Sequence, residues 1–269
     1  RRPARPAPRP ARPWPPGPVV ARRLTESRPA RQPASVVVSA DGRTLAYSIG
    51  AELFVRAVAG SAVQAVPLPV TARGRSRARL VYAVGFFPDG RVAIAMQDTD
   101  DSWGLWAVGG GAAPALVFED SIRFASAISA DGRQAAVALR DRGILVVPTD
   151  GGASRRLAPI NRGELIGGLA WSPDGAQLAF VRYAADWSGD TLEVVTADGR
   201  ESRVLVRGEL GNPLDQLVAW TGPDRIVYGT SAADGAALAA VRVGPAGAIG
   251  PPVELVRWPG AYAGHGGYG

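Results

Sequence analysis

Cysteine and lysine are absent from this 269-residue chain, which holds one histidine and one methionine. Without cysteine there is no disulfide, no thiol nucleophile and no thiolate metal site, although the redox compartment is left open. Zinc and copper sites draw on histidine or cysteine, so the sequence also excludes these two metals. All 30 basic residues are arginine, which is typical of a GC-rich genome. The choice of arginine over lysine therefore carries little functional meaning.

The residue patterns of common hydrolases are missing as well. The sole histidine, His265, lies in a glycine-rich tail, where a Ser-His-Asp triad would lack a firmly held base. No Gly-x-Ser-x-Gly nucleophile elbow occurs. Calcium could use acidic side chains, but Asp98–Gly104 lacks the glycine and terminal glutamate spacing of a calcium loop. We therefore expect no catalytic residue, no cofactor and no metal site, and we interpret the chain as non-enzymatic.

The positive charge is concentrated at one end. Residues 1–31 contain nine arginines against the single acid Glu26, whereas the remaining chain has a net balance of −2. This distribution argues against a nucleic-acid partner for the rest of the chain. No 18-residue apolar run and no signal peptide occur, so we expect any membrane attachment to come from an adjacent span outside this chain.

The pattern that organises the chain is a tight turn between two apolar runs. In its clearest copy, Leu169–Phe180, the sequence Ser-Pro-Asp-Gly fits a type I turn in which proline presets φ and glycine closes the turn. The turn aspartate recurs every 42 to 50 residues, at Asp41, Asp89, Asp131, Asp174 and Asp224. Four copies keep a glycine after it, which we interpret as structural: Gly42, Gly90, Gly132 and Gly175. A repeat of this length built from short strands predicts propeller blades.

The predicted fold is therefore all-β, a β-propeller with about five recognisable four-stranded blades. We expect a Pro/Arg-rich linker at 1–18, propeller repeats over 19–257 and a glycine-rich start of a further blade or tail at 258–269. The expected blades cover about 34–70, 80–119, 121–160, 165–207 and 214–256. Because the chain begins without Met and stops soon after the fifth repeat, we expect a fragment of a ring of six or more blades, with an opening between the fifth and first blades.

Residues 34–256 resemble the TolB-like β-propeller repeat family, whose blades carry a Ser-Pro-Asp-Gly turn followed by Leu-Ala-Phe, as in residues 172–180. Some segments also resemble the propellers that follow the membrane span of bacterial receptor-type serine/threonine protein kinases: Trp14-Pro15-Pro16, Arg22-Arg23-Leu24, Leu53–Gly60 and Pro251–Glu254. The kinase signature itself is absent from this chain. Blades one and three depart from the family pattern, because they carry Ser-Ala-Asp-Gly.

This resemblance implies an extracytoplasmic or periplasmic location in a bacterium, while the sequence leaves a cytoplasmic one open. We expect a non-catalytic sensing or protein-interaction module, attached to a membrane-anchored kinase. Two alternatives stay open: a periplasmic TolB-like scaffold, and the gating propeller of a serine peptidase whose catalytic domain lies outside this chain.

The ligand, a protein or a small molecule, has no signature in the sequence. An aromatic residue in a loop is a better binding candidate than one in a strand. The loop candidates are Trp103 with Asp100 and Asp101, and Trp187 with Asp186. Trp171 and Trp220 precede their turns at matching positions, so we interpret them as packing residues.

Overall fold

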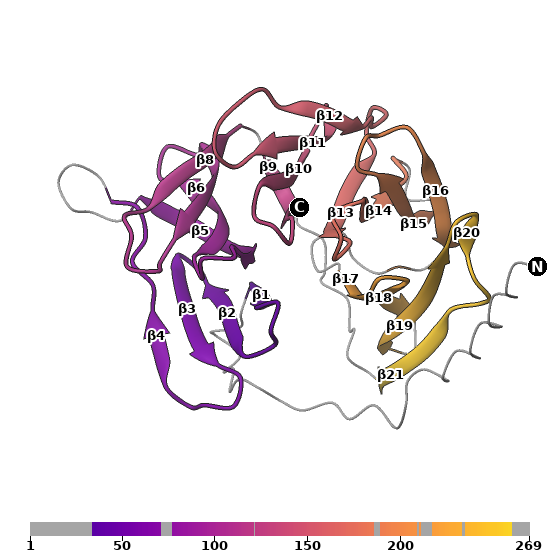
Figure 1. The fold of residues 1–269 in the computed structure, drawn as a ribbon, viewed down its shortest axis with the longest axis horizontal. Coiled ribbons are helices and arrows are strands. Elements are labelled where there is room, and N and C mark those ends of the chain that lie inside the picture. The colour runs from indigo at the N-terminus through magenta and orange to yellow at the C-terminus, as the bar shows by residue number, and fades with distance from the viewer. Residues whose placement is uncertain are drawn as a thin grey trace, which may run out of the picture.

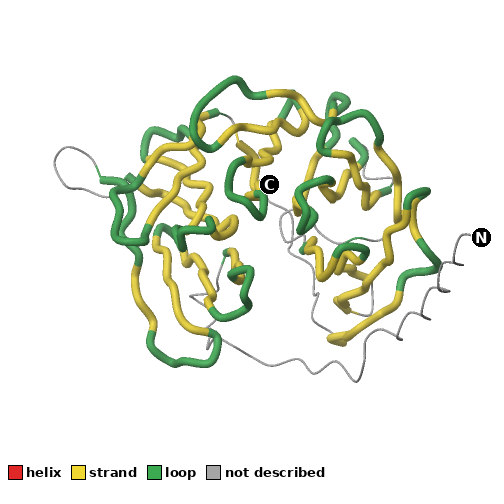
Figure 2. The backbone as a smooth tube through the Cα atoms, viewed as in Figure 1, coloured by secondary structure: helices red, strands yellow, loops and turns green. Residues whose placement is uncertain are grey.

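The computed structural model describes residues 34–70, 77–120, 122–185, 189–208, 210, 217–232 and 235–259. In these residues every regular element is a strand, so there is no helix that could cross a membrane. The strands form five antiparallel sheets arranged around a common centre (Figures 1 and 2). This arrangement is a β-propeller, and it confirms the predicted all-β fold with five four-stranded blades.

Each blade follows the chain outward from the centre of the ring. Blade one contains β1 (Ser35–Val38), β2 (Thr44–Ile49), β3 (Glu52–Ala57) and β4 (Val63–Ala65). Blade two contains β5 (Ala78–Phe86), β6 (Val92–Asp98), β7 (Trp103–Val108) and β8 (Ala115–Glu119). Blade three contains β9 (Ile122–Ile128), β10 (Gln134–Leu139), β11 (Gly143–Pro148) and β12 (Arg155–Ala158).

Blade four contains β13 (Leu165–Trp171), β14 (Gln177–Tyr183), β15 (Asp190–Thr196) and β16 (Ser202–Arg207). Blade five contains β17 (Val218–Gly222), β18 (Arg225–Ala232), β19 (Gly235–Gly244) and β21 (Val253–Pro259). The short β20 (Gly247–Ala248) pairs with the end of β19. The outer strand of blade five thus runs to Pro259, past the expected end at 256. The expected linker at 1–18, the first part of the expected repeat region at 19–33 and His265 lie outside the described residues.

The turn between the first two strands of a blade is held by its own side chains. In blade four the Ser172 hydroxyl donates to Asp174 Oδ1 at 2.6 Å and accepts from the Gln177 amide at 2.9 Å. The Ala176 amide donates to the same carboxylate at 3.0 Å, and Gly175 takes a φ of 69° that favours glycine. The same bonds recur around Asp41 in blade one and Asp131 in blade three. The recurring sequence phrase is thus a turn that joins each innermost strand to the next.

Blade two has a shorter version of this turn. The Phe87 amide donates to the Arg91 carbonyl, whereas the Ser172 amide reaches the carbonyl of Gln177, one position further along the repeat. Phe87 also stands where the other blades have serine, so the Asp89 carboxylate accepts from Arg91 instead. Residues at the same place in different blades therefore share a strand pairing, but not the same number of residues from the turn aspartate.

The core lies between neighbouring blades, because the second and third strands bury apolar residues on both faces. Ala179 and Val181 of β14 pack toward blade five, while Leu178 and Phe180 pack toward blade three. Similar clusters join blade one to two and blade two to three. Each blade is therefore stabilised mainly by the blades on either side of it.

In the described part of the chain, no closely packed strand pair joins blade five to blade one. Figure 1 shows these two blades on either side of an opening in the ring. On blade one, the side that faces away from blade two carries three half-exposed valines: Val36, Val38 and Val63. Residues 1–33 and 260–269 are outside the described part of the chain, so an open ring and a sixth blade both stay predictions.

Candidate binding site

Trp103 lies in a strand rather than in the loop that the sequence analysis assigned to it. It is the first residue of β7 and the register partner of Gln97 in β6. Its ring reaches across β6 and stacks on Tyr82 of β5, with 6.1 Å between the ring centroids and an interplanar angle of 24°. The residue is half-buried and packs against the apolar cluster that joins blades two and three. The loop between β6 and β7 therefore ends before Trp103, one residue earlier than the sequence predicts. The indole of Trp103 is engaged in packing.

The acidic tip of that hairpin is held by local bonds. Asp101, at a φ of 68°, pairs with Arg79 and accepts from Gln97 Nε2 at 3.1 Å. Hydrogen bonds from Ser102 hold the pKa of Asp100 below its ordinary value of 3.8. Among the described residues no three histidine, cysteine or acidic side chains are grouped to hold a metal. The other two candidates, Asp186 and Trp187, lie outside the described residues.

In blades one to four the turn aspartates have pKa values below the ordinary one, because hydrogen bonds stabilise their carboxylates. In Asp131 the largest cause is the hydrogen bond from the Ser129 hydroxyl, followed by the Arg133 amide, which both stabilise the carboxylate. The same pair of causes acts on Asp41 and Asp174, and the Arg91 amide has the main lowering effect on Asp89. These carboxylates are therefore ionised at neutral pH, and each is partly used by its own turn.

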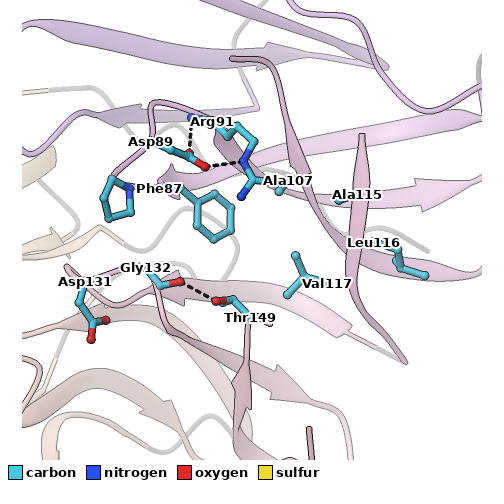
Figure 3. Close-up of a pocket in the computed structure, with 11 residues that line it drawn as sticks. Phe87, Asp89, Arg91, Ala107, Ala115, Leu116, Val117, Asp131, Gly132 and Thr149 are labelled. Carbon is cyan, nitrogen blue, oxygen red and sulfur yellow. Dashed lines mark hydrogen bonds and ion pairs between the residues drawn. The ribbon is translucent and has the colours of Figure 1, made fainter. Parts of the chain in front are cut away.

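A pocket of about 280 Å³ opens between blades two and three, next to two of these turns (Figure 3). Its walls come from segments far apart in the sequence. Blade two contributes its first turn and the beginning of its outer strand β8, and blade three contributes its first turn and the residue after β11. The lining residues include Phe87, Asp89, Arg91, Ala115, Leu116, Asp131 and Thr149.

Hydrogen-bond acceptors dominate the polar wall of this pocket. Arg91 is already engaged within blade two, because its Nε donates to Asp89 Oδ2 at 2.7 Å and its guanidinium lies 5.3 Å from the centre of the Phe87 ring. The Thr149 hydroxyl donates to the Gly132 carbonyl at 2.6 Å, as the dashed line in Figure 3 shows. With Asp131 added, the charged residues of the pocket sum to −1. Such a site favours a ligand that donates hydrogen bonds and carries positive charge.

The turn residues Asp89, Asp131 and Gly132 of this pocket could be predicted from the sequence, but the pocket itself could not. Arg91, Leu116 and Thr149 carry no motif, and they meet only because blades two and three lie side by side. Leu116 is 46% exposed at the rim. One signal in the sequence, the residue at the beginning of each outer strand, is informative only once the strand register is known.

The structure thus combines a propeller fold with a pocket on the face that carries its turns. No family profile and no curated protein sequence matches the chain. Its fold matches a structure named TolB from Agrobacterium tumefaciens, with a TM-score of 0.65 and 18% identity over 85% of this chain and 82% of that one. TolB from Acinetobacter baumannii gives a TM-score of 0.60 and 14% identity over 79% of this chain and 52% of that one, so this chain spans about half of it. The chain therefore has the TolB-like β-propeller fold.

The same fold also occurs in an enzyme. Oligogalacturonate lyase in complex with manganese matches with a TM-score of 0.54 and 16% identity, over 81% of this chain and 64% of that one. Likeness of fold therefore does not decide between binding and catalysis, and function has to be argued from the side chains of this chain.

Proposed function

We propose that this chain is a non-catalytic module that binds a protein partner through the pocket between blades two and three. The observation that carries the proposal is the pocket itself: it combines ionised carboxylates with an exposed apolar rim, and its one arginine is engaged within blade two. An apolar rim beside satisfied polar groups is typical of interaction surfaces. The carboxylates hold turns through their own hydrogen bonds, so none is poised as a free general base.

A site-specific photo-crosslinker tests this proposal. It is placed at Leu116 on the rim of the pocket and, as a matched control, at Val63, which is 49% exposed on the outer strand of blade one. We expect a discrete partner to be captured at position 116 and not at position 63. Equal capture at both positions, or none at 116, would show that this surface is not the binding site.

The finer proposal is that the module is the extracytoplasmic sensor of a membrane-anchored serine/threonine kinase. Its support is the resemblance of the opening segments and of Leu53–Gly60 to such propellers, together with the basic residues 1–31. The TolB-like fold supports an extracytoplasmic scaffold as the second candidate.

The reading frame that encodes this chain separates the two candidates. A kinase domain followed by a membrane span upstream of residue 1 supports the sensor. A signal peptide directly upstream, without a kinase domain, supports the scaffold and contradicts the sensor.

A further inference from the structure

The outer strands of blades three and four each carry, within their first two residues, an arginine that bridges to the next blade. Arg155 of β12 donates from Nη2 to the carbonyl of Ala197 in blade four, at 2.5 Å. Arg203 of β16 donates from Nη1 to the carbonyl of Pro245 in blade five. Both arginines thus cross the junction between two blades and satisfy a carbonyl in the turn that follows the third strand of the next blade.

Strand register identifies the equivalent residue in blade two as Ala115. Arg155 pairs with Val146 and Arg203 with Val194, while Ala115 pairs with Ala107. In all three blades one further pair follows and then the register shifts, between Leu105 and Trp106, Ile144 and Leu145, or Leu192 and Glu193. The three positions are therefore structurally the same, and blade two has a methyl group where its two successors have a guanidinium.

The turn whose carbonyl would accept the arginine has the same backbone hydrogen bond in blades three and four. Ala197 follows β15, and its amide donates to the carbonyl of Ala176 at 2.8 Å. Thr149 follows β11 in the same way, and its amide donates to the carbonyl of Arg133 at 3.0 Å. Thr149 is therefore the equivalent of Ala197, but no donor from the described residues reaches its carbonyl. Ala115 and Thr149 both line the pocket.

We propose that the pocket between blades two and three is an arginine-binding slot, which takes the guanidinium of a partner protein in the place that Arg155 and Arg203 fill at the next two junctions. Ala115 and Leu116 would contact the aliphatic stem, and the Thr149 carbonyl and the Asp131 carboxylate would accept from the head. Arginine fits better than lysine, because its planar fork of donors can reach two separate acceptors. This inference rests on the proposed function and names the chemistry of the partner.

Arg91 does not fill the slot from within. It lies in the pocket, but its guanidinium turns back onto Asp89 and the Phe87 ring of its own blade. In blade one the equivalent of Ala115 is Gln64, which pairs with Val55. The described pocket is thus the junction where a small side chain, an acceptor turn and an acidic residue meet.

Nuclear magnetic resonance with a small probe tests the slot in the full chain. Nα-acetyl-arginine amide is titrated into 15N-labelled protein, and Nα-acetyl-citrulline amide, a neutral molecule of nearly the same shape, is the control. We expect saturable shifts of the Thr149, Gly132 and Asp131 amides with arginine, and binding that is roughly tenfold or more weaker with citrulline, because hydrogen bonds to a charged group are stronger.

Three variants make the test specific. Ala115→Arg should fill the slot with its own side chain and abolish the response. Asp131→Asn keeps an acceptor for the turn but removes the charge, so it should weaken binding several-fold. Arg155→Ala should open the equivalent slot between blades three and four, and add an arginine-dependent shift at Ala197.

The proposal is overturned if the full chain does not respond to arginine, if citrulline acts equally well, or if Ala115→Arg keeps the response. Should Ala115→Arg fail to fold, the Asp131→Asn and Arg155→Ala results decide in the same way. Capture of a partner at position 116 without an arginine response would leave the proposed function standing and remove only this inference.

Discussion

Trp220 donates from its indole Nε1 to the carbonyl oxygen of Ala170 at 3.0 Å, and so links blade five to the innermost strand of blade four. Trp171 stands at the equivalent position in blade four, since the two tryptophans pair with Ile226 and Leu178, which both face the preceding blade. The Trp171 Nε1 is buried without a partner in the described part of the chain. One repeated aromatic position thus packs in both blades but makes a hydrogen bond in only one.

Replacing Trp220 by Phe should therefore cost about 1 kcal/mol more than replacing Trp171 by Phe, once the shared loss of packing is subtracted. Urea unfolding of the two variants and the parent chain measures this difference. An equal loss in both variants would mean that the Trp220 hydrogen bond contributes nothing.

Acid should weaken the propeller through its turns. The Ser172 hydroxyl and the Ala176 amide hold the pKa of Asp174 below 3.8 in the folded chain. Because the folded value lies below the unfolded one, the stabilisation is complete above the unfolded pKa and is lost as the pH falls through the folded pKa. Asp174→Asn keeps an acceptor but does not titrate, so its free energy of unfolding should decline less steeply below about pH 4. Urea unfolding between pH 3 and pH 6 checks this, and identical slopes would contradict it.

An ion-pair network within blade four should stabilise the propeller. Arg182 lies 2.9 Å from both Glu164 and Glu193, and its side chain is 20% exposed. Arg182→Met would leave two largely buried carboxylates without their cation, and we expect a loss of roughly 3 kcal/mol.

The matched control is Arg200→Ala, which breaks a 3.4 Å pair with Asp198 in which the arginine side chain is 85% exposed. Its effect should stay within about 0.5 kcal/mol. Chemical denaturation measures both variants, and a small effect for Arg182→Met would show that the network is not a source of stability.

How far the sequence predicts this molecule depends on the range of the interactions. The turn around Asp174 and Gly175 is formed by residues close together in the sequence, so its recurrence along the chain predicts five blades. Beside Asp100 and Asp101 the sequence predicts a loop at Trp103, but stacking on Tyr82 and pairing with Gln97 extend the strand to this residue. Such cross-strand contacts override local composition.

The pocket could not be predicted from the sequence for a related reason. The pocket is open because Ala115 occupies the position that Arg155 and Arg203 occupy in the next two blades. The first turn of blade two is also one residue shorter than those of blades one, three and four. The distance from the turn aspartate to this position is 26 residues in blade two, 24 in blade three and 29 in blade four, because the later hairpins also differ in length. Counting from the aspartate therefore aligns the wrong residues. The match appears only in the strand register, and the acceptor at Thr149 belongs to the next blade.

Two glycines with similar backbone angles should respond very differently to alanine. Gly175 has a φ of 69° and open space where a Cβ would stand, so Gly175→Ala should cost about 1 kcal/mol of backbone strain. Gly143 has a φ of 78°, and a Cβ there would lie 2.2 Å from the Ala158 carbonyl oxygen. Gly143→Ala must also displace β12, so its melting temperature should fall well below that of Gly175→Ala. Equal melting temperatures would contradict the close approach at Gly143.

The central claim is that blade two leaves open an arginine position that blades three and four fill from within. A crystal structure of the Ala115→Arg variant tests it most directly. We expect the introduced guanidinium to cross to blade three and donate to the Thr149 carbonyl, as the Arg155 guanidinium donates to the Ala197 carbonyl. A guanidinium directed into solvent, with the pocket still open, would contradict the account.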